Sequence, residues 1–232
     1  MKILSIECSA VPCSACVSEG DMVLSADFMN VGLTHSQTLM PMVEKVLKEA
    51  NISISDIDGF GVSAGPGSFT GIRIGISAIK GMATPLNKPC FPVSTLFAMA
   101  QNYRDTDCIV CAVMDARCNQ VYNANFEILD GKITRLCEDR ALLCEELAKE
   151  IKNISQNEKK CVIIVGDGAN LFYEFVKDFE NVSKAEEDKM YQNAIGVALA
   201  IKDSVEPKEL LPVYLRLPQA ERELKLKRSN EK

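Results

Sequence analysis

The sequence predicts an α/β protein built from two similar halves. Short β-rich segments alternate with segments whose apolar residues recur at helical spacing. The second half repeats the order of the first: strands with a hairpin, then a helix, a strand and a further helix. The composition is that of a folded protein, because 47% of the 232 residues are hydrophobic and 25% are charged. Only 6% are aromatic and none is Trp, so we expect an aliphatic core.

The first half is expected to begin with three strands, with Glu19-Gly20-Asp21 as a hairpin turn. Thr34 can cap the helix that follows, and Pro41 either marks the first turn of that helix or kinks it. The expected elements are strands at Ile3–Glu7, Pro12–Val17 and Met22–Phe28, a helix at Thr34–Ala50, a strand at Gly59–Ala64 and a helix at Thr70–Thr84.

The second half restarts the pattern with a strand and a helix capped by Ser94 or Thr95. The expected elements are a strand at Cys90–Val93, a helix reaching about Tyr103, strands at Cys108–Asp115 and Gln120–Ile128, a helix at Ala141–Lys152, a strand at Cys161–Val165 and a helix at Tyr191–Lys202. We therefore expect an N-terminal lobe over residues 1–104, a C-terminal lobe over 105–216 and a flexible basic tail over 217–232.

The net charge is −6, which makes the chain a poor stand-alone binder of nucleic acid or of an anionic membrane. The segment from Arg216 to Lys232 is locally basic, with six basic and three acidic side chains. Such a segment is either a solvated end or a phosphate contact. No apolar run approaches the ~20 residues of a membrane span, and the first residues do not resemble a signal peptide. We expect a cytoplasmic protein whose ten cysteines are reduced.

Two cysteine pairs have the spacing of zinc ligands, Cys13/Cys16 and Cys108/Cys111. Both pairs fall in expected strands, where residues three apart point to opposite faces of the sheet. Only His35 could add an imidazole ligand. The sequence therefore favours structural thiols and predicts no metal site.

The glycine-rich segment Gly65–Gly71 joins a strand to a helix, where a turn can hold phosphate. It lacks the lysine of a Walker loop, and Thr70 occupies a glycine position of the dinucleotide fingerprint. Pro66 removes one amide donor as well. A tight turn that packs the strand closely on the helix is the favoured interpretation.

The helix after this turn carries two adjacent apolar stripes. The first consists of small residues and a methionine: Gly71, Gly75, Ala78 and Met82. The second is aliphatic: Ile72, Ile76, Ile79 and Ala83. One stripe suffices to dock a helix on its own sheet, so the second indicates another helix of the same chain or of a partner.

The inventory of catalytic residues is short. A single histidine excludes sites that need several, and no nucleophile elbow is present. Asp115 and Arg117 flank a hairpin turn and are interpreted as a turn-stabilising pair. Glu7 follows the first strand, where an acid can bind a metal, and Asp167 between two glycines could touch an adenine or a ribose. Glu7 is followed by Cys rather than Gly, without a phosphate-binding nest, and glycine turns like the one around Asp167 are common at strand ends.

Several blocks together resemble one family. In chain order they are MKILSIECS, THSQTLMPMVEKVL, DIDGFGVSAGPGSFTGIRIGISAIKGMA, PVSTLFAMAQ, MDARCNQVYNANFE and PVYLR. They are similar to the TsaB family, also called YeaZ, and GPGSFTGIRIG is the most specific block. The resemblance spans about Met1 to Arg216 and departs from the family at Glu7, where an Asp is usual.

The resemblance implies the two-lobed, duplicated fold of the acetate kinase, sugar kinase, Hsp70 and actin superfamily, with a degenerate active site. It implies a non-catalytic scaffold, without cofactor, for threonylcarbamoyladenosine formation at position 37 of tRNAs that read ANN codons. The implied partners are TsaD, the catalytic paralogue, and TsaE, an ATPase that joins the TsaB–TsaD pair. A homodimer is possible in isolation, and tRNA is contacted only indirectly. TsaD has paired histidine metal ligands, whereas this chain has only His35.

The resemblance also implies that the helices Thr34–Ala50 and Thr70–Thr84 bind the partner. Carried over to this sequence, the expected interface residues are Leu39, Met42, Val43, Val46, Gly71, Ile72, Gly75, Ile76, Ala78, Ile79 and Met82. Two alternatives are weighed against the scaffold. An ATP-dependent phosphotransferase of the same fold lacks its phosphate loops, and a stand-alone peptidase lacks its histidines.

Overall fold

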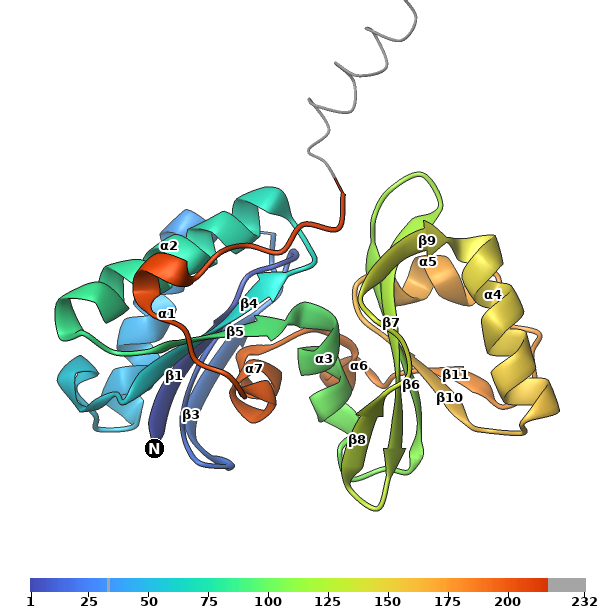
Figure 1. The fold of residues 1–232 in the computed structure, drawn as a ribbon, viewed down its shortest axis with the longest axis horizontal. Coiled ribbons are helices and arrows are strands. Elements are labelled where there is room, and N and C mark those ends of the chain that lie inside the picture. Colours follow the sequence, from blue (N-terminus) through green and yellow to red (C-terminus); the bar gives the residue numbers. More distant parts are fainter. Residues whose placement is uncertain (33, 217–232) are drawn as a thin grey trace, which may run out of the picture.

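The computed structural model describes residues 1–32 and 34–216 and divides them into two lobes, each built on one mixed sheet (Figure 1). The five-stranded sheet has the order β3-β2-β1-β4-β5, and the six-stranded sheet has the order β11-β10-β6-β7-β8 with β9 also paired to β7. The expected tail at 217–232 lies outside the described residues. Among the described residues, no helix is long and apolar enough to cross a membrane.

The N-terminal lobe follows the expected element order closely. Its elements are β1 Lys2–Glu7, β2 Cys13–Glu19, β3 Met22–Met29, α1 His35–Glu49, a 3-10 turn at Ile54–Asp56, β4 Gly59–Gly65, α2 Phe69–Leu86, β5 Cys90–Ser94, α3 Thr95–Ala100 and a 3-10 turn at Gln101–Tyr103. Pro41 lies inside α1 and does not mark its start. Ser68 caps α2 by accepting a hydrogen bond from the Gly71 amide at 3.2 Å.

The C-terminal lobe contains more strands than expected. Its elements and those that follow are β6 Cys108–Asp115, β7 Gln120–Leu129, β8 Lys132–Arg135, β9 Arg140–Leu143, α4 Cys144–Lys152, a π-helical turn at Asn153–Asn157, β10 Val162–Val165, α5 Ala169–Tyr173, β11 Val182–Lys184, α6 Glu187–Met190, α7 Ala194–Ala200 and a 3-10 turn at Pro207–Glu209. The expected helix at Ala141–Lys152 was too long, because its first residues form β9 against β7. The expected helix at Tyr191–Lys202 is shortened to α7.

The two sheets share one topology, which confirms the predicted duplication. In each lobe the first strand pairs antiparallel with the second, β1 with β2 and β6 with β7. In each lobe the first strand also pairs parallel with the strand that follows the first long helix of that lobe, β1 with β4 and β6 with β10. When β9, which pairs with β7 off the main path, is left out, both sheets therefore have the order third-second-first-fourth-fifth. This is the duplicated α/β architecture that the sequence predicts.

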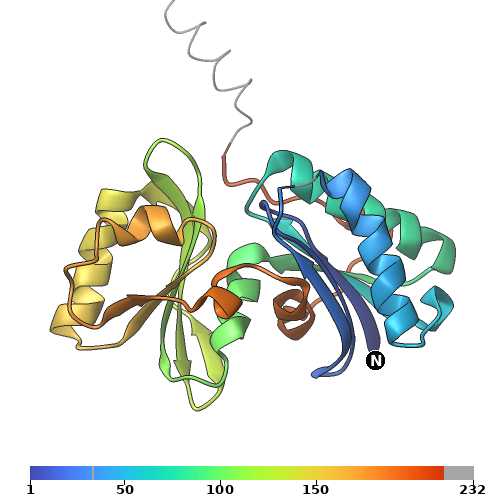
Figure 2. The same cartoon turned by 180° about the vertical axis from the view of Figure 1, so that it is seen from behind.

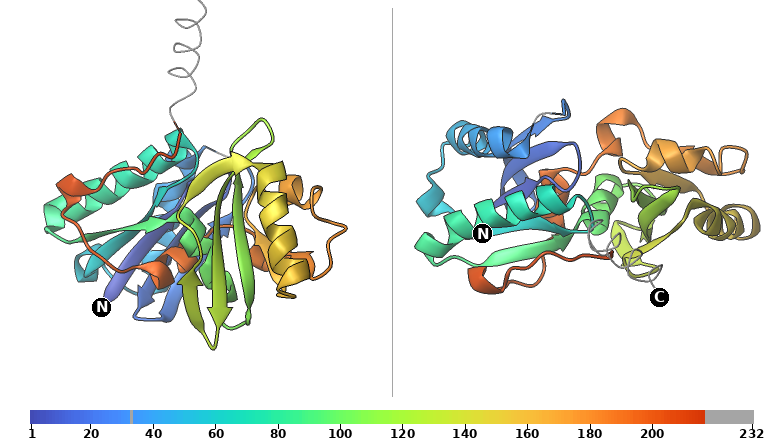
Figure 3. Two further views of the ribbon diagram at one scale, coloured as in Figure 1. Left: turned by 45° about the vertical axis from the view of Figure 1, so that its right-hand side comes forward. Right: turned by 90° about the horizontal axis from the view of Figure 1, so that it is seen from above.

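Helices α1 and α2 cover one face of the N-terminal sheet, and α7 covers the other (Figures 2 and 3). The alternation along β1 explains this arrangement. Leu4 and Ile6 join the core beneath α1 and α2, whereas Ser5 lies on the α7 side beside Gly61, close to Val197. The two cysteine pairs lie on strands β2 and β6 as predicted.

The chain returns to the N-terminal lobe after the second sheet. Ala194 and Ala198 of α7 pack with Cys16 of β2. Beyond α7, Val205 forms a bridge with Cys90, and Leu210 is fully buried in the N-terminal core. The segment 201–216, which we call the return segment, therefore belongs with the first sheet. The expected C-terminal lobe at 105–216 is too long by α7 and this segment.

Candidate functional site

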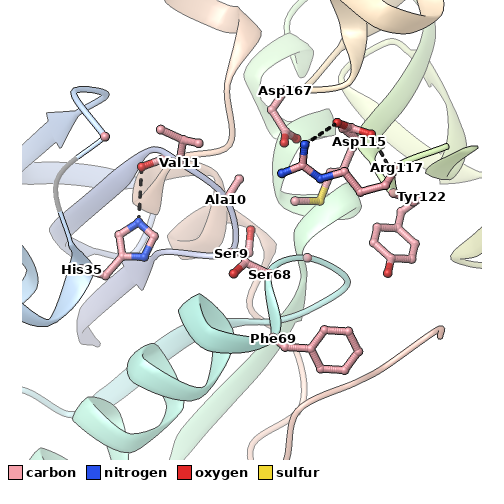
Figure 4. A pocket seen from close by; sticks show the side chains of 14 residues that line it. Ser9, Ala10, Val11, His35, Ser68, Phe69, Asp115, Arg117, Tyr122 and Asp167 are labelled. Atoms are coloured by element: carbon pink, nitrogen blue, oxygen red, sulfur yellow. Dashed lines mark hydrogen bonds and ion pairs between the residues drawn. The ribbon is translucent and has the colours of Figure 1, made fainter. Parts of the chain in front are cut away.

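A cavity of about 640 Å³ opens between the lobes, where β1 and β6 end (Figure 4). Its volume would accommodate a small molecule. The N-terminal lobe contributes hydroxyl and apolar side chains, and the C-terminal lobe contributes two carboxylates, a guanidinium and a phenol. The lining residues that Figure 4 labels are Ser9, Ala10, Val11, His35, Ser68, Phe69, Asp115, Arg117, Tyr122 and Asp167.

Glu7 lies behind this cavity and is fully buried. Its Oε1 accepts the Ser9 amide at 2.5 Å, and its Oε2 accepts the Ser63 hydroxyl. Burial raises the pKa of the Glu7 carboxyl, and these hydrogen bonds offset part of the rise. The carboxyl is therefore occupied in shaping the turn after β1 and is not presented to a metal ion in the cavity.

The glycine-rich turn before α2 packs against that same turn after β1. The Ser68 amide donates to the Ser9 carbonyl at 2.6 Å. A Cβ at Gly67 would lie 2.4 Å from the Ser9 carbonyl oxygen, so only glycine allows this approach. The turn thus matches the favoured sequence interpretation of close strand–helix packing, and one of its amides is already bonded within the chain.

The C-terminal wall of the cavity holds Asp115, Arg117 and Asp167 close together (Figure 4). Asp115 accepts the Arg117 amide at 2.7 Å, and its other oxygen lies 3.7 Å from the Arg117 guanidinium. This agrees with the predicted turn-stabilising pair. Burial raises the pKa of Asp167 to about 6, and a 3.3 Å hydrogen bond from Gln192 opposes the rise. The wall is acidic, so it suits a cationic or hydrogen-bond-donating group better than a phosphate.

The return segment contacts Phe69 and Ala116, two residues that line the cavity from opposite lobes. Tyr214 stacks on Phe69 with 4.6 Å between ring centroids, and its hydroxyl accepts from Arg73 Nε at 2.7 Å. Arg216 then reaches the other lobe and donates to the Ala116 carbonyl at 2.6 Å.

Among residues 1–32 and 34–216, no group of three or more His, Cys, Asp or Glu side chains is arranged to hold a metal ion.

The predicted interface residues occupy a different environment from the one expected for a docking surface. Those on α1, the three isoleucines of the aliphatic stripe of α2 and Met82 of the other stripe are buried in the N-terminal core: Leu39, Met42, Val43, Val46, Ile72, Ile76, Ile79 and Met82. Gly71 and Gly75 are also buried, and a Cβ there would lie 2.0 Å from the Cys8 carbonyl oxygen and 2.7 Å from Cys8 Sγ. Their small size therefore serves packing within the chain.

The outward side of α2 carries another stripe, which we call the outer stripe: Ile74, Ala78, Gly81 and Pro85. Ile74 and Ala78 are half-buried, whereas Gly81 and Pro85 are exposed. A Cβ at Gly81 would meet no atom within 4 Å. Ala78 is the residue shared by this stripe and the predicted interface set.

Two features of the site were not predicted from the sequence. The sequence places the return segment in the C-terminal lobe, although its Pro-Val-Tyr-Leu-Arg block is one of those that carry the family resemblance. Tyr122 was treated only as a strand residue, because an aromatic residue in a β-rich run gives no sign that it faces a cavity.

Comparison with known proteins gives a consistent result. The family model described as TsaD, tRNA N6-adenosine threonylcarbamoyltransferase, matches residues 30–226. The tRNA threonylcarbamoyladenosine biosynthesis protein TsaB of Bacillus subtilis is 26% identical over 225 residues, which cover 95% of this chain and 96% of that protein.

A second relative and a solved structure agree with these matches. The TsaB protein of Buchnera aphidicola subsp. Schizaphis graminum is 32% identical over 197 residues, covering 83% of this chain and 89% of that protein. The structure of YeaZ from Pseudomonas aeruginosa superposes with a TM-score of 0.76 at 26% identity, covering 92% of this chain and 99% of that chain.

Proposed function

The chain belongs to the TsaB (YeaZ) family, and we propose that it acts in threonylcarbamoyladenosine formation on tRNA as a non-catalytic scaffold for a TsaD-type transferase. The proposed product site is position 37 of tRNAs that read ANN codons. The family relationship supports the biosynthetic role. The structural features of the cavity and of helix α2 support the scaffold role.

The cavity supports a non-catalytic role because the acid after β1 and a turn amide before α2, which a phosphotransferase would use, are engaged within the chain. Glu7 is buried and hydrogen-bonded, and the Ser68 amide is bonded to Ser9. Asp115 is paired with Arg117, and burial raises the pKa of Asp167. A phosphotransferase needs free amides and a metal-binding acid at these positions. The phosphotransferase alternative is therefore disfavoured.

Gly81 carries the argument for the partner surface. A glycine inside a helix costs about 1 kcal/mol relative to alanine. Gly71 and Gly75 have a reason within the chain, because a Cβ would collide with Cys8. Gly81 has none among the described residues, because its Cβ would point into open space. A close helix crossing from another molecule would supply the reason.

The proposed interface is therefore the outer stripe of α2 with the exposed side of α1. Docked helices would meet Ile74, Ala78, Gly81 and Pro85, whereas the buried residues predicted from the sequence would support the surface from beneath. The TsaD-type transferase is the proposed occupant, and a second copy of this chain would use the same surface in isolation. An ATPase of the TsaE type would join the assembled pair, and tRNA would be bound by the assembly.

The test is binding of TsaD by purified Gly81→Leu and Gly81→Ala variants. Overpacking at a close helix crossing costs about 1–3 kcal/mol, so Gly81→Leu should bind TsaD about tenfold to a hundredfold more weakly. Both variants should melt at or above the wild-type temperature, because the residue is exposed. Lys149→Leu adds the same side chain to the exposed face of α4 and serves as the control.

Wild-type affinity of the Gly81→Leu variant for TsaD would place the partner elsewhere. The catalytic part of the proposal is tested separately. Purified chain should neither hydrolyse ATP nor transfer the threonylcarbamoyl group without TsaD, and steady ATP turnover by the chain alone would contradict it.

A further inference from the structure

Cys108 is the first residue of β6, and Cys161 immediately precedes β10, the parallel neighbour of β6 in the C-terminal lobe. Val162 of β10 is paired with Ile109 of β6, so the preceding residues, Cys161 and Cys108, are opposite each other. The Ile109 amide donates to the Cys161 carbonyl at 2.8 Å, which fixes this register at the end of the ladder. Parallel neighbours are separated by about 4.8 Å, and their side chains share one face of the sheet. That spacing is within the Cα separation of ~4.4–6.8 Å found in disulfides.

The two thiols differ in exposure. Cys161 is one of two exposed cysteines in the chain, together with Cys118, whereas Cys108 is 8% exposed. Both cysteines line a hollow of about 200 Å³ with an apolar wall from Ile128 and Leu129. Burial raises the pKa of Cys108 to about 11, and the neighbouring Cys161 adds to the rise. Cys161 is therefore the thiol that meets a reagent from solvent first.

We propose that Cys108 and Cys161 form a reversible thiol–disulfide site that reacts with low-molecular-mass disulfides such as oxidised glutathione. The Cys161 thiolate attacks one glutathione sulfur, which forms a mixed disulfide and releases one glutathione thiolate. The Cys108 thiolate then attacks the Cys161 sulfur and releases the second glutathione. The pair loses two electrons and two protons, and the oxidised glutathione is reduced to two thiols.

The disulfide would join the first residue of β6 to the residue that precedes β10, at the opposite ends of these strands from the interlobe cavity. β6 ends at Asp115, and Asp167 lies two residues beyond the end of β10, so that both strands lead to carboxylates of the cavity wall. Closing the long chain segment between Cys108 and Cys161 restricts the unfolded chain, so oxidation should raise the melting temperature by about 5 °C or more.

The experiment incubates the full chain with oxidised glutathione and maps the products by mass spectrometry of unreduced digests. The wild type should yield a linked peptide pair that contains Cys108 and Cys161. The Cys108→Ala variant should instead accumulate glutathione on Cys161, because the second thiol is missing. The Cys118→Ser variant should still form the linked pair, since only the other exposed thiol is removed.

Accumulation of glutathione on wild-type Cys161, equal to that in the Cys108→Ala variant, would overturn the proposal. A linked pair that joins other cysteines would overturn it as well. The melting temperature of reduced Cys108→Ala confirms that this variant is folded before it is compared.

Discussion

At the residue scale, Glu7 and Asp167 show how burial controls two acids near the same cavity. Burial raises the pKa of both carboxyls. The cost of burying the Glu7 carboxylate is partly offset by two hydrogen-bond donors from its own lobe, Ser9 and Ser63. Asp167 has a longer bond from Gln192 and a pKa of about 6. A buried acid that is poorly compensated weakens the fold whenever it is ionised.

Asp167→Asn should therefore stabilise the chain at pH 8 and leave it unchanged near pH 4. An acid whose pKa is raised on folding holds its proton more tightly in the folded state, so stability falls as pH rises from about 4 to about 6. Asparagine has no charge to bury, and the gain at pH 8 should be at most about 3 kcal/mol. Urea unfolding of the variant and the wild type at pH 4 and pH 8 measures this difference in the free energy of unfolding.

The matched variant for this test is Asp178→Asn, which removes an exposed carboxylate of the same lobe. It should show no comparable difference between the two pH values. An Asp167→Asn variant with equal or lower stability than the wild type at pH 8 would mean that the ionised carboxylate is well compensated in the folded chain.

At the scale of elements, α2 separates glycines with opposite roles. Gly71→Ala should destabilise the chain by about 3 kcal/mol, because the new methyl group would lie 2.0 Å from the Cys8 carbonyl oxygen and backbone must move. Gly81→Ala should instead stabilise it by about 1 kcal/mol. Thermal or urea unfolding of the two single variants and the wild type measures these opposite changes in stability. Equal stability of the Gly71→Ala variant and the wild type would mean that the turn after β1 yields easily.

Element by element, the sequence predicts what depends on local pattern. The strand and helix order of the first half and the hairpin of β6 and β7 were predicted correctly, because their periodicity and turn residues are local signals. β8 was not predicted although it follows β7 through the Asp130-Gly131 turn, because its four residues include two basic ones and form too short a strand pattern. β9 was not predicted because its pairing with β7 joins residues that are far apart in the sequence. The orientation of α2 also could not be derived, because it depends on where Cys8 lies in space. The sequence therefore identified the two helices, but the residues that it gave for their partner-binding surface are buried in the structure, apart from the half-buried Ala78.

At the scale of the whole molecule, the return segment ties the two lobes together beside the cavity. Tyr214 is held on α2 by Phe69 and Arg73, and Arg216 donates to the Ala116 carbonyl of the opposite lobe. The two contacts join residues that line the cavity from opposite lobes. It is expected to restrict how far the lobes separate.

Arg216→Ala should loosen this connection with little change in overall stability. A hydrogen bond from a charged donor contributes about 1.5–3 kcal/mol at most, and this one is partly exposed. Amide hydrogen exchange around Ala116 should become faster, while exchange in β1 and β4 stays the same. Arg104→Ala removes a surface ion pair with Asp21 and serves as the comparison. Identical exchange at Ala116 in the Arg216→Ala variant and the wild type would show that the lobes are held by other contacts.

The return of the chain to its first lobe also bears on how the protein is made. Leu210 completes the core that Leu4 and Ile6 begin, Val205 bridges to Cys90, and the Val213 amide donates to the Ala64 carbonyl. A nascent chain still on the ribosome has the first sheet but not the residues that cover and brace it. Domains commonly fold in order of synthesis, yet here the first lobe must wait for the last described residues. The second lobe, which is contiguous in sequence, is therefore expected to mature before the first.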